Sequence, residues 1–119
     1  MGLFHITSLT AWQAAQDAGE YRAPSLATEG FIHLSTDRQW LRTANRFFRG
    51  QHALVLLSIR RDALAAPLRF EPADGDEFPH LYGVLNLDAV VEVCALPVAA
   101  DGEIGIPPEL APWRQYFTS

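Results

Sequence analysis

The segment A-L-V-L-L-S-I, residues 53–59, constrains the fold of this 119-residue chain more than any other. It is a continuous apolar run of strand length, and it lacks the alternating polar residues of a strand with one solvent-facing side. Such a run is typical of a central strand that is covered on both faces. We therefore expect a sheet built around residues 53–59, with other elements packed on each side of it.

Two other segments alternate like strands, and each has a histidine at its centre. The first is L-F-H-I-T in residues 3–7, and the second is F-I-H-L-S in residues 31–35. Successive side chains of a strand point to opposite faces, so in each segment an apolar residue, the histidine and a hydroxyl residue share one face. Two further strands are predicted, at residues 68–71 and 87–96.

The shared strand faces indicate a candidate site. His5 faces the same way as Thr7, and His33 faces the same way as Ser35. If the two strands are neighbours, two imidazoles and two hydroxyls line one patch, which suits a small polar ligand. The alternative for each histidine is a hydrogen-bonded core residue without a ligand. The occurrence of one pattern on two strands keeps the ligand site as a hypothesis.

Two main helices are predicted in the first half of the chain. Each starts at a threonine that is followed three residues later by a glutamine, the spacing of a capping box, and each ends at a glycine. These residues are Thr10, Gln13 and Gly19 for the first helix and Thr36, Gln39 and Gly50 for the second. Residues 20–30 and 72–83 are predicted to be loops because proline, glycine and polar residues punctuate them. Strands outnumber helices, and the helices cluster early, so we expect an α+β fold.

The length of the chain suits one domain. We assign residues 1–97 to that domain and residues 98–119 to a tail that is rich in proline and glycine. Within the tail, Trp113, Tyr116 and Phe117 have the spacing of one helical face. We expect this short aromatic helix to dock on the domain or on a second subunit.

The predicted loop at residues 72–83 is a second candidate region. It contains His80 and Tyr82 in the motif F-P-H-L-Y-G, and loops with aromatic and titratable side chains often carry sites. Just before it, Arg69 and Glu71 share one face of a short strand. The alternative for this pair is an exposed ion pair of little energetic value.

The basic residues of the chain are all arginine, nine in number, which excludes lysine chemistry such as a Schiff base. Four of them share one face of the second predicted helix: Arg38, Arg42, Arg46 and Arg49. One interpretation is a solvated helix face. The other is a phosphate clamp, because the guanidinium fork binds phosphate oxygens in pairs. Arg46 lies nearest the aromatic end of the helix and is the candidate ligand residue.

Charge and composition limit the partners. The formal net charge of −5 gives no general attraction to nucleic acid. No apolar run approaches the roughly 18 residues needed to span a bilayer, and the N-terminus lacks the pattern of a secretory signal. The single cysteine, Cys94, can form no internal disulfide, which fits a reducing compartment. We therefore expect a cytoplasmic protein without a nucleic-acid or membrane partner.

Four motifs occur in a specific order: F-H-I-T, E-G-F-I-H-L-S-T, N-R-F-F-R-G and F-P-H-L-Y-G. Together they make residues 3–97 resemble a bacterial family catalogued as a domain of unknown function, number 952. That family is similar in fold to the ADP-ribosyltransferases, including the RNA 2′-phosphotransferases. The resemblance implies a split, mixed β-sheet with two main helices near the N-terminus, arranged around an NAD-binding cleft.

The resemblance also implies roles for individual residues. The motif around His5 resembles one in which the histidine bonds the nicotinamide-side ribose. His33 stands near the position of a tyrosine that stacks on nicotinamide. The third motif of those enzymes is a glutamate on a late strand, for which Glu71 and Glu92 are the alternatives, and His80 falls in the same corner.

Three functions remain open. The first is an enzyme that acts on NAD or a related ADP-ribosyl or nucleotide-phosphate compound, with NAD as a candidate substrate and a nucleotide-like small molecule as the partner. The second is a non-catalytic module that binds such a ligand. The third is a zinc site made by His5, His33 and His80, although their spacing forms no compact metal motif. The predicted catalytic residues are His5, His33, Glu71 and His80, and the predicted ligand-binding residues are Thr7, Ser35, Arg46 and Tyr82.

Overall fold

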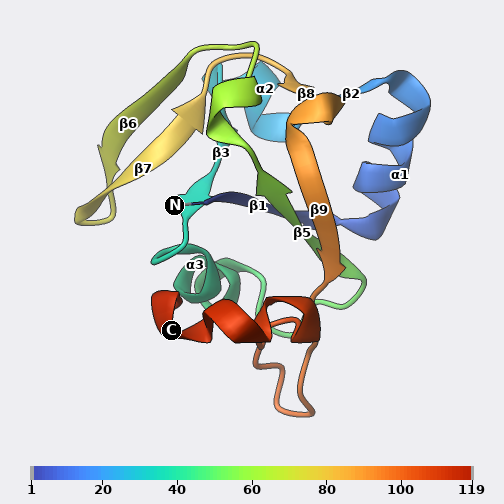
Figure 1. The fold of residues 1–119 in the computed structure, drawn as a ribbon, viewed down its shortest axis with the longest axis vertical. Coiled ribbons are helices and arrows are strands. Elements are labelled where there is room, and N and C mark those ends of the chain that lie inside the picture. The colour runs from blue at the N-terminus through green and yellow to red at the C-terminus, as the bar shows by residue number, and fades with distance from the viewer. Residues whose placement is uncertain (1, 119) are drawn as a thin grey trace.

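A four-stranded antiparallel sheet forms the centre of the protein (Figure 1). The computed structural model describes residues 2–118. Met1, at the start of the predicted domain 1–97, and Ser119, at the end of the predicted tail 98–119, lie outside the described residues. The order of the strands is β4 (Ser35–Thr36), β1 (Leu3–Ser8), β5 (Leu54–Ile59) and β9 (Val90–Ala95). The predicted central strand is confirmed, because β5 pairs with β1 on one side and with β9 on the other.

Both faces of this sheet are covered, as the apolar run in β5 requires. On one face, Leu57 packs in a cluster with Trp12 of α1 (Leu9–Ala18). On the other face, Leu56 packs in a second cluster with Trp40 of α3 (Trp40–Phe47). Full burial of a large apolar side chain contributes about 1.5–3 kcal/mol, so these two clusters provide the main driving force for folding.

A second sheet carries three of the predicted site residues, His33, Glu71 and His80. Its order is β3 (Ile32–His33), β7 (Asp76–Leu81) and β6 (Leu68–Ala73). Strands β6 and β7 form a hairpin that extends away from the central sheet in Figure 1. The prediction of a loop at residues 72–83 is therefore wrong for most of its length. The turn is Asp74-Gly75, with both residues at positive φ (50° and 79°), as a tight two-residue hairpin turn requires.

The segment F-I-H-L-S connects the two sheets. The sequence predicts one strand over residues 31–35, but β3 pairs with β7 whereas β4 pairs with β1. The break is at Leu34, whose backbone N–H donates to the carbonyl of Pro79 at 2.9 Å. The predicted alternation is confirmed over the first part, because Ile32 and Leu34 are buried and His33 is exposed.

The helix starts differ from the predicted positions. Ser8, not Thr10, caps α1, because its hydroxyl accepts from the backbone N–H of Ala11 at 3.0 Å. Helix α3 begins four residues after Thr36, yet half of the predicted capping box forms: the Gln39 side-chain oxygen accepts from the Thr36 N–H at 3.0 Å. That bond stabilises the turn that leads into α3.

The remaining elements are short. The prediction of a loop at residues 20–30 is wrong for most of its length, because this segment contains β2 (Glu20–Tyr21) and helix α2 (Pro24–Glu29). Strand β2 pairs with β8 (Leu85–Asn86). The 3-10 segments are η1 (Arg61–Ala63), η2 (Leu87–Ala89) and η3 (Pro108–Tyr116). The α+β class is confirmed. The prediction of a mixed sheet is wrong, because every strand pair within residues 2–118 is antiparallel.

The C-terminal segment lies beside α3 on one side of the central sheet (Figure 1). Leu110 of η3 belongs to the second core cluster, and Phe117 packs its ring against Phe4 and Trp40 with centroids 6.0 and 5.2 Å apart. Of the predicted aromatic face, Phe117 packs on the core, whereas Trp113 and Tyr116 are about half exposed. Within residues 2–118, no helix has both the length and the apolar character that crossing a bilayer demands.

Candidate functional site

His5 lies in the core, with both ring nitrogens bonded to the protein. Its Nδ1 is 2.7 Å from the backbone carbonyl oxygen of His33, and its Nε2 is 2.8 Å from the hydroxyl of Tyr21. Thr7 completes the network, since its hydroxyl lies 3.0 Å from that of Tyr21. The side chains of His5 and Thr7 are buried, as is Ser35. The predicted patch of two imidazoles and two hydroxyls therefore does not form.

The bonding of His5 defines its protonation. A carbonyl oxygen only accepts, so Nδ1 carries the proton that reaches His33. Burial lowers the pKa of His5 to about 4, despite the backbone hydrogen bond, which acts in the opposite direction. His5 is consequently neutral near pH 7, and its Nε2 accepts from the hydroxyl of Tyr21. Burial also raises the pKa of Tyr21, so this phenol stays protonated.

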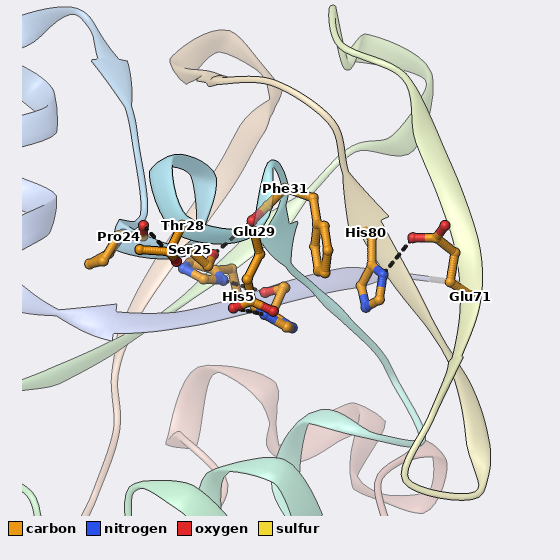
Figure 2. Close-up of polar contacts among 9 residues, drawn as sticks. His5, Pro24, Ser25, Thr28, Glu29, Phe31, Glu71 and His80 are labelled. Carbon is orange, nitrogen blue, oxygen red and sulfur yellow. Dashed lines mark hydrogen bonds and ion pairs between the residues drawn. The ribbon is translucent and has the colours of Figure 1, made fainter.

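A different group of predicted residues meets on one face of the hairpin sheet. His33 lies opposite His80, and Arg69 lies opposite His80 on the other side of β7. Alternate residues share a face, which places Glu71 of β6 and Tyr82, just after β7, beside them. Figure 2 shows the imidazole of His80 directed at Glu71. The structure therefore brings His33, Glu71, His80 and Tyr82 together and leaves His5, Thr7 and Ser35 in the core.

Glu71 joins the polar groups of this face. Its Oε1 is 2.7 Å from Nδ1 of His80 and accepts a 2.6 Å bond from the hydroxyl of Tyr82. The Tyr82 bond, followed by the His80 bond, lowers the pKa of Glu71, and the same carboxylate raises the pKa of Tyr82. Arg69 lies with its guanidinium 5.1 Å from the centre of the Tyr82 ring. Glu71 is thus an ionised acceptor that fixes the orientation of His80.

Phe31 covers His80 and was not among the predicted site residues. Its ring is stacked on the imidazole, with centroids 4.0 Å apart and planes at 19° (Figure 2). The ring of His33 meets both, 4.8 Å from Phe31 and 5.3 Å from His80. The signal for Phe31 was present in the sequence, because alternation puts it on the same face as His33. We call Phe31, His33, Glu71, His80 and Tyr82 the hairpin cluster.

His80 has one buried nitrogen without a partner. The residue is 5% exposed, and its Nε2 makes no hydrogen bond to the residues that the structure describes. When Nδ1 donates to the carboxylate of Glu71, the neutral form of the ring has a free lone pair on Nε2. A buried polar atom left without a partner costs about 1–3 kcal/mol. A water molecule or a ligand atom at this nitrogen would recover that free energy.

The outer edge of the hairpin cluster is more exposed. Nε2 of His33 lies 3.1 Å from Glu29 of α2, and both side chains are about half exposed. Such a pair contributes at most about 1 kcal/mol. The second glutamate alternative, Glu92, lies on β9 of the central sheet, opposite Ser58. Of the two glutamates, Glu71 is the one beside His80.

Arg46 lies at the other end of the hairpin. A pocket of about 360 Å³ lies between α3 and the hairpin turn. Its lining includes Arg42, Arg46 and Phe78. Arg46 lies 3.6 Å from Asp74, and Arg42 lies 3.9 Å from Asp76. The pocket and the hairpin cluster are neighbours, because Phe78 and His80 are two residues apart on β7 and their side chains therefore point to the same face of the sheet.

The described residues offer little to a metal ion. Within residues 2–118, no group of three or more histidine, cysteine, aspartate or glutamate side chains is placed to hold one. The three-histidine hypothesis also conflicts with His5, whose two nitrogens are already bonded. Cys94 is buried, and desolvation raises the pKa of its thiol to about 11, which leaves it protonated and unreactive.

Solved structures of a protein from Caulobacter crescentus, CC0527, resemble this one. A crystal structure of CC0527 matches with a TM-score of 0.82 and 36% identity, over 88% of this chain and 94% of that one. Its solution structure matches with a TM-score of 0.76 and 35% identity, over 94% and 95% of the two chains. The comparison with curated proteins found no match.

The comparison with family models agrees with the four motifs in the sequence. One model, described as "Protein of unknown function (DUF952)", matches residues 6–93, close to the predicted span of 3–97. Those residues include both strands of the hairpin and the predicted strand that bears His33, and they begin just after His5. The predicted family is confirmed, and the chain belongs to the DUF952 family.

Proposed function

We propose that the protein binds a nucleotide-like small molecule at the hairpin cluster and that His80 is its acid–base group. The observation that carries this proposal is the free Nε2 of His80, held in place by the bond from Nδ1 to Glu71. A histidine oriented by a carboxylate, with its second nitrogen free, has the arrangement of a general base. The reaction class is transfer of an ADP-ribosyl or 2′-phosphate group, with NAD as a candidate substrate.

His80 has a simple task in such a transfer. An acceptor hydroxyl forms the new bond to the ribosyl carbon or to phosphorus, and the leaving group departs with the electrons of the bond that breaks. Nε2 of His80 takes the proton that the acceptor hydroxyl loses. Glu71 then faces an imidazolium cation at 2.7 Å, which an ionised carboxylate stabilises.

The aromatic members of the hairpin cluster suit a planar ring. Phe31, His33 and Tyr82 surround His80, and a nicotinamide or a base can stack on such rings. Phe31 already covers one face of the His80 imidazole, so a ligand atom approaches Nε2 from the edge of that ring. His5 contributes from the core as a positioning residue, since it holds the backbone of His33.

A non-catalytic binding module is the second candidate. The observation that favours it is the burial of Nε2 of His80, which leaves that nitrogen little access to a reacting atom. A module of this kind binds the ligand on the exposed aromatic edge beside His33 and leaves it unchanged. Binding without any product distinguishes this candidate from the transferase.

The test is calorimetry with NAD, ADP-ribose and a nucleotide 2′-phosphate, together with mass spectrometry of the mixtures. The variants are His80→Gln and the matched control His52→Gln, an exposed histidine just before β5. We expect His80→Gln to weaken binding roughly tenfold or more and to abolish any turnover, because a buried hydrogen bond to the ligand is lost. The control should behave as the unchanged protein. Absence of heat with all three compounds, or equal effects of the two variants, contradicts the proposal.

A further inference from the structure

The pocket between α3 and the hairpin turn contains two arginines, which supply the hydrogen-bond donors of an anion subsite. We infer that it binds the phosphate group of the ligand through Arg42 and Arg46, so that the substrate class is a phosphate-bearing nucleotide. This inference rests on the proposed function and adds the second anchoring point of the ligand. The pocket, of about 360 Å³, is lined by two arginines, two aspartates and two phenylalanines, together with Thr43 and Gly75.

The two arginines keep their hydrogen-bonding capacity. They are four residues apart on α3 and therefore lie on the same face of the helix. Arg46 lies 3.6 Å from Asp74 and Arg42 lies 3.9 Å from Asp76, and both separations exceed hydrogen-bond length. Their N–H groups are oriented by the aspartates without being saturated. A phosphate oxygen that enters the pocket can accept from both forks.

Asp76 does not depend on Arg42. One carboxylate oxygen accepts from the side-chain amide of Gln39 at 3.0 Å, and the other accepts from the backbone N–H of Glu77 at 2.8 Å. Ligand binding can therefore draw Arg42 away from Asp76 without leaving a buried charge unpaired. The ion pairs are exposed, so each one that is broken costs less than about 1 kcal/mol.

Phe47 adds an aromatic wall to the pocket. It is 56% exposed, which is unusual for a phenylalanine on a helix that packs on the core. The guanidinium of Arg46 lies 5.1 Å from the centre of its ring. A nucleotide base can stack on the exposed surface of Phe47 while its phosphate binds the two arginines. An aromatic surface and an arginine pair in one pocket match the two parts of a nucleotide.

The position of the pocket connects it with His80. Phe78 lines the pocket and lies two residues before His80 on the same face of β7, a separation of about 7 Å along the strand. A ligand whose phosphate is held by Arg42 and Arg46 therefore extends along the hairpin toward the hairpin cluster. The same strand presents both ends of the predicted site.

The experiment compares pyrophosphate, AMP and adenosine as probes for the unchanged protein and three variants. Arg42→Gln and Arg46→Gln alter the pocket. Arg38→Gln is the matched control, because Arg38 is an exposed arginine in the turn before α3 and does not line the pocket. The control keeps the backbone carbonyl that accepts from Thr118. All three side chains are exposed on the surface, so thermal melting should confirm that each variant folds.

We expect both pocket variants to weaken AMP and pyrophosphate binding roughly tenfold, because a charged hydrogen-bond pair is lost. Adenosine binding and the control should change little, and added salt should weaken AMP more than adenosine. Equal loss for Arg38→Gln, or equal affinity for AMP and adenosine, overturns the inference. His80→Gln separates the two proposals. If His80→Gln weakens NAD binding while Arg42→Gln and Arg46→Gln leave AMP binding unchanged, only the phosphate inference fails. If His80→Gln leaves NAD binding unchanged while the two arginine variants weaken AMP binding, only the proposed function fails.

Discussion

Nδ1 of His5 lies 2.7 Å from the backbone carbonyl oxygen of His33, so the histidine of one strand supports the backbone of the other. That carbonyl belongs to the last residue of β3, just before the chain crosses at Leu34 from the hairpin sheet to the central sheet. The bond therefore fixes the connection between the two sheets. It also links the core at His5 with the edge of the hairpin cluster at His33.

The stability of the protein should fall in mild acid because of His5. Its pKa is about 4 in the folded protein and about 6.5 when it is exposed, so the unfolded state binds more protons between these values. The contribution is fully present above pH 6.5 and is lost as the pH falls toward 4. A difference of that size corresponds to about 3 kcal/mol. Urea unfolding at a series of pH values measures it.

His5→Gln is the control for this dependence, since glutamine does not titrate. The variant should be less stable at pH 7, yet its free energy of unfolding should decline less between pH 6.5 and 4.5. The two proteins have the same carboxylates, so the contribution of those groups to the pH dependence cancels in the comparison. Parallel pH profiles for the two proteins would refute a neutral, buried His5.

Tyr21→Phe should destabilise the protein by about 1–3 kcal/mol. The phenol hydroxyl links Nε2 of His5 and the hydroxyl of Thr7, and its removal leaves both buried groups without that partner. Tyr116→Phe is the matched control, because Tyr116 is 51% exposed and its change should lie within about 0.5 kcal/mol. Denaturant midpoints of the two variants give the comparison. Equal midpoints would mean that the network contributes nothing to stability.

The parts of the fold that local patterns determine could be predicted from the sequence. The apolar run of β5 and the in-and-out alternation of Ile32, His33 and Leu34 need only the period of a strand. The break at Leu34 could not be found in this way. The same alternation fits one strand with one neighbour and a segment that changes sheets, and only the distant partners, β1 and β7, distinguish the two.

The candidate site was predicted in part for a related reason. His5 and His33 have the same local pattern, yet one is buried and one is exposed. The difference depends on Tyr21, which comes from a segment predicted to be a loop and is 16 residues from His5 in sequence. The hairpin, in contrast, had a local signal. Asp74-Gly75 between two strand-like runs is typical of a tight hairpin turn, but the proline, glycine and polar residues of 72–83 favour a loop.

Gly75→Ala should destabilise the hairpin by about 1 kcal/mol. Gly75 has a φ of +79°, where an alanine is strained, although no other atom lies within 4 Å of an added Cβ. Gly105→Ala is a matched control with no positive φ and only an ordinary contact, 3.6 Å from Pro97. Amide hydrogen exchange should show faster opening of β6 and β7 in Gly75→Ala alone. Equal exchange in the two variants would contradict a backbone requirement for glycine at this turn.

Tyr82→Phe should raise the pKa of Glu71 toward the ordinary value of a glutamate. The 2.6 Å bond from the Tyr82 hydroxyl is the largest cause of the lowered pKa, ahead of the bond from His80. Carbon-13 NMR of the side-chain carboxyl, followed through a pH titration, measures this directly. Tyr116→Phe serves again as the control, since Tyr116 lies on η3, away from the hairpin sheet. A Glu71 that titrates identically in both variants would mean that His80 alone orders the carboxylate. In that case Tyr82 would act on the ligand through its ring and not through Glu71.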